Sequence, residues 1–141
     1  MISTTLKTGI VLALFCCVST LSFAKNNSTM IKPWFQALFP VDREVISQLL
    51  AENALIELKD YDITQTKDEF VESLDSWEDA IENGSIAYKI DHQNSNDDYI
   101  ITKVCYKFTS NELMTVELFL FNDGMIIKSV QETVADHCSG F

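Results

Sequence analysis

The fold of this chain is decided by one stretch near its C-terminus, Glu117-Leu118-Phe119-Leu120-Phe121-Asn122-Asp123-Gly124-Met125-Ile126. The Leu and Phe residues before the turn are typical of a β-strand. The Asn-Asp-Gly sequence predicts a tight hairpin, because such turns need residues that tolerate positive φ angles. We therefore expect paired strands over 113–121 and 125–134.

The segments before this hairpin alternate with a period of two. Apolar side chains recur at every second position over 86–90 and over 100–108, on either side of the polar turn 94–98. This pattern predicts two further strands. The last four strands of the chain should therefore form one meander.

The N-terminal half has helical patterns instead. A capping box formed by Thr66 and Glu69 predicts a helix that ends at the stop signal Asn83-Gly84. Shorter helices are expected over 31–39 and 42–50, with a short strand over 54–58. Helices followed by a meander predict an α+β domain, in which helices pack on one face of a curved antiparallel sheet.

The composition is that of one acidic globular domain. The chain has 141 residues, 47% of them hydrophobic, and a formal net charge of −11. The hydrophobic fraction is too high for a disordered chain. Binding of nucleic acid is excluded as a function, because the Lys/Arg footprint that a phosphate backbone requires is missing.

The N-terminus has the pattern of a secretory signal peptide. Lys7 supplies the positive charge, 9–18 is the apolar run, and Ser22-Phe23-Ala24 is a small-x-small cleavage site. We expect residues 1–24 to be removed, 25–30 to be flexible, and 31–141 to be the folded domain. The mature chain would be periplasmic or extracellular and not embedded in a membrane. A retained N-terminal anchor is the alternative, although the apolar run is short for a membrane span.

Two cysteines remain after such cleavage, Cys105 and Cys138. In an oxidising compartment an even pair favours a disulfide. Two unpaired thiols, or pairing between chains, are the alternatives.

The order of these elements, together with two sets of residues, resembles the nuclear transport factor 2-like superfamily, which includes SnoaL-like and ketosteroid isomerase-like proteins. The first set runs from Trp34 through Ala37-Leu38 and Val41-Asp42 to Leu49-Leu50-Ala51-Glu52-Asn53-Ala54, and the second is 117–126. The resemblance implies a cone-shaped, cystatin-like α+β roll with an apolar pocket. It further implies that the outer sheet face, with Lys103, Cys105 and Lys107, forms a homodimer contact.

The resemblance also implies which side chains line the pocket. The expected ligand-binding residues are Trp34, Tyr88, Val104, Tyr106, Phe108, Glu117, Phe119 and Phe121. A carboxyl group among apolar walls should have a raised pKa, so Glu117 is the expected polar anchor. Its alternatives are a buried water, a backbone partner or exposure to solvent.

The isomerase catalytic set does not carry over. By the resemblance, the position of the proton-shuttling base is Leu58, which cannot accept a proton, and that of the donor tyrosine is Trp34. Only the acid position keeps a carboxyl group, at Glu117. Asp60 or Asp62 could replace the base only if the strand bulges. His92 is a second candidate acid or base, although a solvated loop position is the favoured explanation for it.

No cofactor or metal is expected. The acidic repeat 60–68 resembles a calcium loop but has Gln65 where glycine is needed and Val71 where a bidentate Glu is needed. The favoured function is a secreted, non-enzymatic module that binds a small apolar ligand, or a protein partner through the outer sheet face. The alternatives are an enzyme that acts on a lipid-like or polyketide-like substrate through Glu117, and an immunity-type interaction module.

Overall fold

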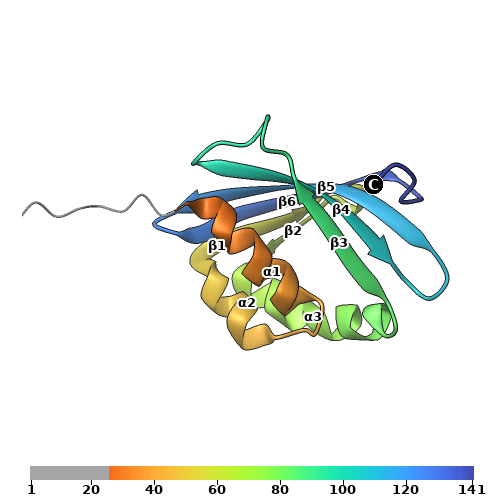
Figure 1. Cartoon of the computed structure of the whole chain (residues 1–141). Coiled ribbons are helices and arrows are strands. Elements are labelled where there is room, and N and C mark those ends of the chain that lie inside the picture. The colour runs from red at the N-terminus through yellow and green to blue at the C-terminus, as the bar shows by residue number, and fades with distance from the viewer. Residues whose placement is uncertain (1–25) are drawn as a thin grey trace, which may run out of the picture.

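The computed structural model describes residues 26–141, so the expected signal peptide lies outside the described residues. Its three helices are α1 (Ile31–Leu38), α2 (Arg43–Leu49) and α3 (Lys67–Ile81), with short 3-10 turns at η1 (Asn27–Met30) and η2 (Lys59–Tyr61). Its six strands are β1 (Leu50–Leu58), β2 (Ile63–Thr66), β3 (Ser85–Ile90), β4 (Tyr99–Lys107), β5 (Glu112–Asn122) and β6 (Met125–Ala135). The helices cover the concave face of one bent sheet (Figure 1).

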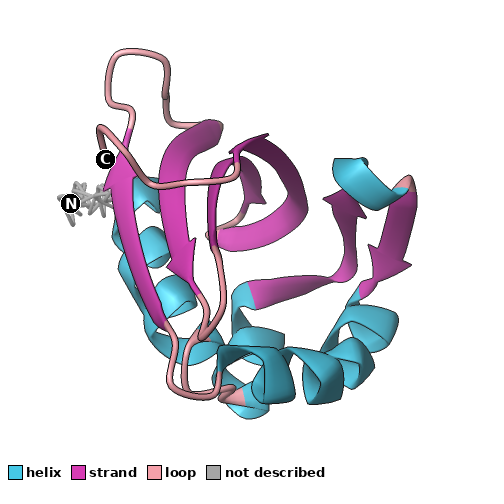
Figure 2. Ribbon diagram, turned by 90° about the vertical axis from the view of Figure 1, so that its right-hand side faces the viewer, coloured by secondary structure: helices cyan, strands magenta, loops and turns pink. Residues whose placement is uncertain are grey.

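The sheet has the order β2-β1-β6-β5-β4-β3. The meander β3–β6 is antiparallel, as its alternation predicts, while β1 joins β6 in parallel and β2 pairs antiparallel with β1. Register shifts interrupt the pairing of β1 with β6 and of β5 with β6. Such bulges bend a sheet, and Figure 2 shows the strands wrapping around the helices without closing into a barrel. The fold is thus the expected α+β roll.

Local sequence signals explain the helix boundaries. Asp42 accepts a hydrogen bond from the backbone N–H of Val45 and begins α2. Thr66 and Glu69 form the expected capping box of α3. At the end of α3, Asn83 and not Gly84 adopts the positive φ angle, of 62°.

Gly84 has a different role at this corner. A Cβ atom there would lie 2.7 Å from the backbone oxygen of Lys107. Glycine is therefore needed because the chain passes directly against β4.

Three expectations need correction. The strand expected over 54–58 begins at Leu50, because Leu50 already pairs with Ile126 of β6. The segment 63–66, for which no strand is expected, forms the edge strand β2 against β1. The part of the expected flexible segment that is described, 26–30, forms the turn η1, in which Asn26 caps Ser28 and Asn27 donates to the backbone of Asp97.

The core lies between the helices and the sheet. Its largest buried side chains come from the three helices and the inward positions of β1, β4, β5 and β6, and they include Ile31, Trp34, Ile46, Leu50, Leu74, Val104, Phe119 and Ile126. Among residues 26–141, no helix is both long enough and apolar enough to cross a membrane.

Candidate functional site

The helices and the sheet enclose a cavity of about 370 Å³. It is bounded by one face of α3, the ends of α1 and β1, and inward positions of β4, β5 and β6. Exposed residues such as Tyr61, Ser76 and Ala80 belong to its lining, so the cavity opens to solvent. The remaining lining residues are Trp34, Leu38, Ile56, Leu58, Gln65, Phe70, Ser73, Leu74, Trp77, Tyr106, Phe108, Leu113, Glu117, Ser129 and Gln131.

Glu117 is the only carboxyl group in this lining, and its side chain is 2% exposed. Strand alternation places it on the inward face of β5, between Thr115 and Phe119. Its Oε1 atom accepts a hydrogen bond of 2.5 Å from the Tyr106 hydroxyl and one of 3.2 Å from the Thr115 hydroxyl. Glu117 is therefore a buried acid held by two neutral donors.

Burial controls the protonation of this pair. Loss of solvent raises the pKa of Glu117 to about 7, although the hydrogen bonds from Tyr106 and Thr115 oppose this rise. Burial, together with the nearby Glu117 carboxylate, raises the pKa of Tyr106 well above its usual value. Tyr106 is therefore a neutral donor near pH 7, where Glu117 populates both of its protonation states.

The walls of the cavity are largely aromatic. Trp34 stacks on Phe70 with ring centroids 5.9 Å apart, and Trp77 meets Tyr106 edge to face at 5.5 Å. Phe108 completes the second group, in contact with both Trp77 and Tyr106. Such rings present large apolar surfaces to a ligand.

Two buried polar atoms at the cavity have no hydrogen-bond partner among the described residues. They are the Nε1 atom of Trp34 and the Oε1 atom of Gln65. The second indole, that of Trp77, donates to the backbone oxygen of Leu38 at 3.0 Å. An unpartnered buried donor or acceptor costs about 1–3 kcal/mol, so a ligand or a water that reaches either atom is stabilised there.

The structure places four of the eight expected ligand-binding residues at the cavity, namely Trp34, Tyr106, Phe108 and Glu117. The other four are Tyr88, Val104, Phe119 and Phe121, and none of them lines it. The reason is helix α1, whose side chains fill that half of the cone: Phe35 stacks on Tyr88 at 4.6 Å, and Trp34 and Phe35 both pack on Phe119. Val104 and Phe121 are buried in the same core.

Of the other positions considered for acid–base chemistry, one lines the cavity and two do not. Leu58, which the resemblance places at the position of the isomerase base, lines the cavity with an apolar side chain. Asp60 lies outside, because both of its carboxylate oxygens accept from the backbone N–H of Thr133. His92 is exposed in the loop after β3 and does not line the cavity.

Sequence reasoning missed several polar lining residues, among them Gln65, Ser129 and Gln131. Gln131 is the register partner of Glu117 on β6. Counting back from the Asp123-Gly124 turn would pair Glu117 with Val130 instead, because the register shift between Leu120 and Phe121 is not visible in the sequence. Gln65 lies on β2, which is too short to show a period.

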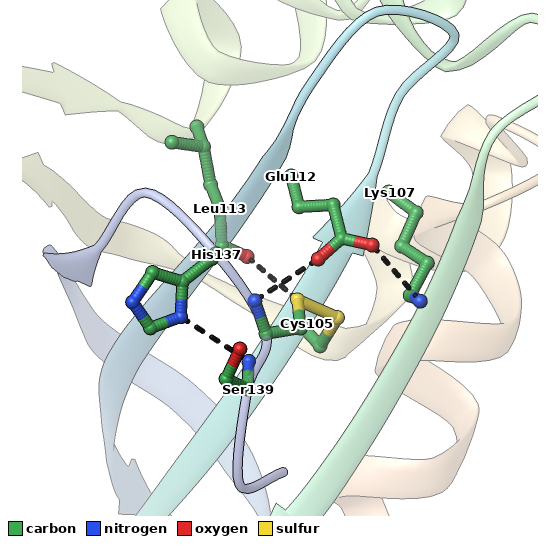
Figure 3. Close-up of a disulfide and its surroundings, with 7 residues drawn as sticks. Cys105, Lys107, Glu112, Leu113, His137 and Ser139 are labelled. Atoms are coloured by element: carbon green, nitrogen blue, oxygen red, sulfur yellow. Dashed lines mark hydrogen bonds and ion pairs between the residues drawn. A yellow bond between two sulfur atoms is a disulfide. The ribbon is translucent and has the colours of Figure 1, made fainter.

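The expected disulfide between Cys105 and Cys138 is confirmed (Figure 3). It fastens the segment after β6 to the outer face of β4. Glu112 supports this attachment, since its carboxylate pairs with Lys107 at 3.0 Å and accepts from the backbone N–H of Cys138 at 3.1 Å. These hydrogen bonds lower the pKa of Glu112. Cys105 is consequently buried on the face where the dimer contact is expected.

The described residues contain no group of three or more His, Cys, Asp or Glu side chains that could hold a metal ion. No protein-family model matches the sequence, and no curated protein matches it either.

Solved structures do match the fold. A putative ketosteroid isomerase from Kribbella flavida DSM 17836 is 14% identical, with a TM-score of 0.64 over 79% of this chain and 80% of that one. Wild-type IdmH, a putative polyketide cyclase from Streptomyces antibioticus, is 14% identical, with a TM-score of 0.65 over 76% and 91%. An epoxide hydrolase of the LEH-like type from M. tuberculosis is 10% identical, with a TM-score of 0.59 over 77% and 83%. This chain therefore has the nuclear transport factor 2-like, ketosteroid isomerase-like fold.

Proposed function

We propose that this protein binds a small, largely apolar ligand in the cavity, with Glu117 as its polar anchor. One observation carries the proposal: the cone is not filled by its own side chains. It retains about 370 Å³ bounded mostly by apolar and aromatic groups, with a single buried carboxyl. A small number of polar groups in an apolar cleft is the usual composition of a small-molecule site. An interaction module would have no need of such a space.

The comparisons support the same proposal. Proteins of this fold include a putative ketosteroid isomerase, a putative polyketide cyclase and an epoxide hydrolase-like protein. Their names refer to different small molecules, so the fold is compatible with ligand binding but does not select the ligand.

The proposal can be tested with the neutral probe N-phenyl-1-naphthylamine, whose fluorescence rises in an apolar site. We expect saturable binding of one probe per chain. In the variant Ser76→Phe a larger side chain occupies the cavity lining, and binding should be lost. The control is Glu72→Phe on the same helix, because Glu72 is exposed and does not line the cavity. Equal binding by both variants would place the probe elsewhere.

A second candidate function is proton-transfer catalysis on the bound ligand. The observation that favours it is the pKa of Glu117, about 7, since an acid or base is most effective when its pKa is close to the working pH. Turnover of a ligand identified by the first experiment would support it, provided that Glu117→Gln binds the ligand and loses the turnover.

We further propose that the chain acts outside the cytoplasm after removal of residues 1–24, and that it pairs through the outer sheet face. The disulfide supports the first part, because such bonds persist in oxidising compartments. The mass of the chain purified from its natural host tests cleavage, and sedimentation of the mature chain tests pairing. An uncleaved cytoplasmic chain, or a monomer at high concentration, would contradict the respective part.

A further inference from the structure

The cavity has an acidic group and no basic one. Its lining contains no Lys, Arg or His, and Glu117 is its only carboxyl. The other titratable groups there are the phenols of Tyr106 and Tyr61. The residues contributed by α1, α3, β1, β2 and β6 are uncharged, and the cross-strand neighbours of Glu117 are the neutral Thr102 and Gln131. Any charge that develops in this cavity is therefore negative.

The carboxyl group of Glu117 has one occupied oxygen and one free oxygen. Both protein donors, the hydroxyls of Tyr106 and Thr115, bind Oε1. Oε2 accepts no hydrogen bond from the residues that the structure describes, and the Glu117 side chain borders the cavity. A ligand would therefore meet Oε2. An ionised carboxylate at low dielectric is strongly stabilised by an opposite charge at such a position.

The aromatic walls of the cavity also favour a positively charged ligand. Trp34 and Phe70 form one stacked pair, and Trp77, Tyr106 and Phe108 form a second group. The faces of these rings carry partial negative charge and attract organic cations, most strongly where water is excluded. The net charge of −11 also draws cations toward the whole protein.

We propose that the ligand of this cavity is a hydrophobic cation, a substituted ammonium whose charged head group lies against Glu117 Oε2 while its apolar body packs on the aromatic rings. This inference rests on the proposed function and narrows it, because it excludes carboxylates and phosphates, which the ionised Glu117 repels. No covalent bond of the ligand changes, and the only bond of the protein that breaks is the O–H bond of a protonated Glu117. When the empty cavity holds protonated Glu117, binding of the cation displaces that proton to the solvent.

Two probes of the same shape, one charged and one neutral, distinguish the contribution of charge to binding from that of shape. Benzyltrimethylammonium carries a permanent positive charge, and neopentylbenzene is its uncharged carbon isostere. The chain has two Trp residues, Trp34 and Trp77, and both line the cavity, so intrinsic fluorescence reports binding without a label. At about pH 8.5 we expect the cation to bind at least about tenfold more tightly than the isostere.

The pH dependence provides an independent readout on the unmodified protein. If the cation binds only ionised Glu117, whose pKa is about 7, its affinity should rise about thirtyfold between about pH 5.5 and about pH 8.5. The affinity of the isostere should stay constant over that range. A ligand that instead accepts a hydrogen bond from protonated Glu117 would show the opposite trend.

The variant Glu117→Gln removes the charge and keeps the shape. We expect this variant to bind the cation at least about tenfold more weakly and with an affinity that does not depend on pH. Its affinity for the isostere should stay unchanged. Glu72→Gln, which removes an exposed charge from α3, should change the affinity for neither probe. If Glu117→Gln does not fold, the pH dependence of cation affinity in the unmodified protein tests the inference by itself.

Three results would overturn the inference while leaving the proposed function intact. They are equal affinities for the two probes, a cation affinity that does not change with pH, and absence of cation binding in a protein that binds N-phenyl-1-naphthylamine. If none of the three probes binds, both the inference and the proposed function fail.

Discussion

Tyr106 and Glu117 share a hydrogen bond although they are not opposite one another in the sheet. Tyr106 pairs with Leu113, and Glu117 pairs with Thr102, which lies four residues earlier in β4. The two side chains therefore lean toward each other along the strands, on the face where Thr115 adds its hydroxyl to the same Glu117 oxygen. This diagonal contact fixes the carboxyl group at the cavity wall, and its energetics can be tested.

Removing the Tyr106 hydroxyl should raise the pKa of Glu117 above about 7. The hydrogen bond from Tyr106 stabilises the ionised carboxylate and so opposes the effect of burial. The variant Tyr106→Phe should also lose about 1 kcal/mol of stability. A ¹³C NMR titration of the Glu117 carboxyl group measures the pKa. Tyr88→Phe is the control, because Tyr88 stacks on Phe35 away from the cavity, and an equal shift in both variants would contradict the assignment.

Glu117 should make the protein less stable as the pH rises. Its pKa is about 7 in the folded state and 4.5 for an unperturbed glutamate, so the folded state binds the proton more tightly. Stability is therefore lost between about pH 4.5 and about pH 7, and two and a half pKa units correspond to about 3 kcal/mol at most.

Urea unfolding at a series of pH values tests this linkage. Glu117→Gln does not titrate at this position, so its stability relative to the unmodified protein should increase with pH and level off above about pH 7. Contributions from all other groups cancel in that difference. A difference that stays constant with pH would mean that Glu117 is not desolvated in solution.

The sequence predicted the inward face of the meander better than the extent of the cavity. Period-two alternation places Tyr106 and Phe108 on one face of their strand. The family resemblance implies that this face and Glu117 point inward. Whether an inward residue borders a cavity or is covered depends on how a helix packs. Trp34 lies 5.6 Å from Phe119, ring to ring, and this contact closes one half of the cone. No local pattern encodes that distance.

Edge strand β2 shows the same limit. Its four residues, 63–66, are mostly exposed and polar, so they have neither an apolar period nor the length of a typical strand. They are held by pairing with β1, which itself joins the sheet through a parallel contact with β6. The β1–β6 pairing joins residues that are far apart in the sequence, such as Leu50 and Ile126, and short-range propensities do not determine it.

Gly84 should be intolerant of even one added methyl group. In Gly84→Ala the new Cβ would lie 2.7 Å from the Lys107 oxygen and 3.0 Å from the Ile81 oxygen, and both are backbone atoms. We expect a loss of about 1–3 kcal/mol, measured by urea unfolding. The neighbouring variant Ser85→Ala changes an exposed side chain and should have little effect. Unchanged stability in Gly84→Ala would mean that the corner between α3 and β3 moves away from β4 at no cost.

The disulfide should stabilise the fold without shaping the cavity. Cys105 and Cys138 lie 33 positions apart, so reduction should cost roughly 3–4 kcal/mol through the larger entropy of the unfolded chain. Urea unfolding with and without dithiothreitol measures this cost. The double variant Cys105→Ala, Cys138→Ser provides the control, because it should not respond to the reductant.

Reduction should also raise the pKa of Glu112, since its carboxylate loses the backbone N–H of Cys138 when the segment after β6 is released. Binding of N-phenyl-1-naphthylamine should persist, because no residue of 136–141 lines the cavity. Loss of probe binding in a reduced protein that remains folded would show that the outer attachment of β4 controls the inner face, and that the two faces of the sheet are coupled.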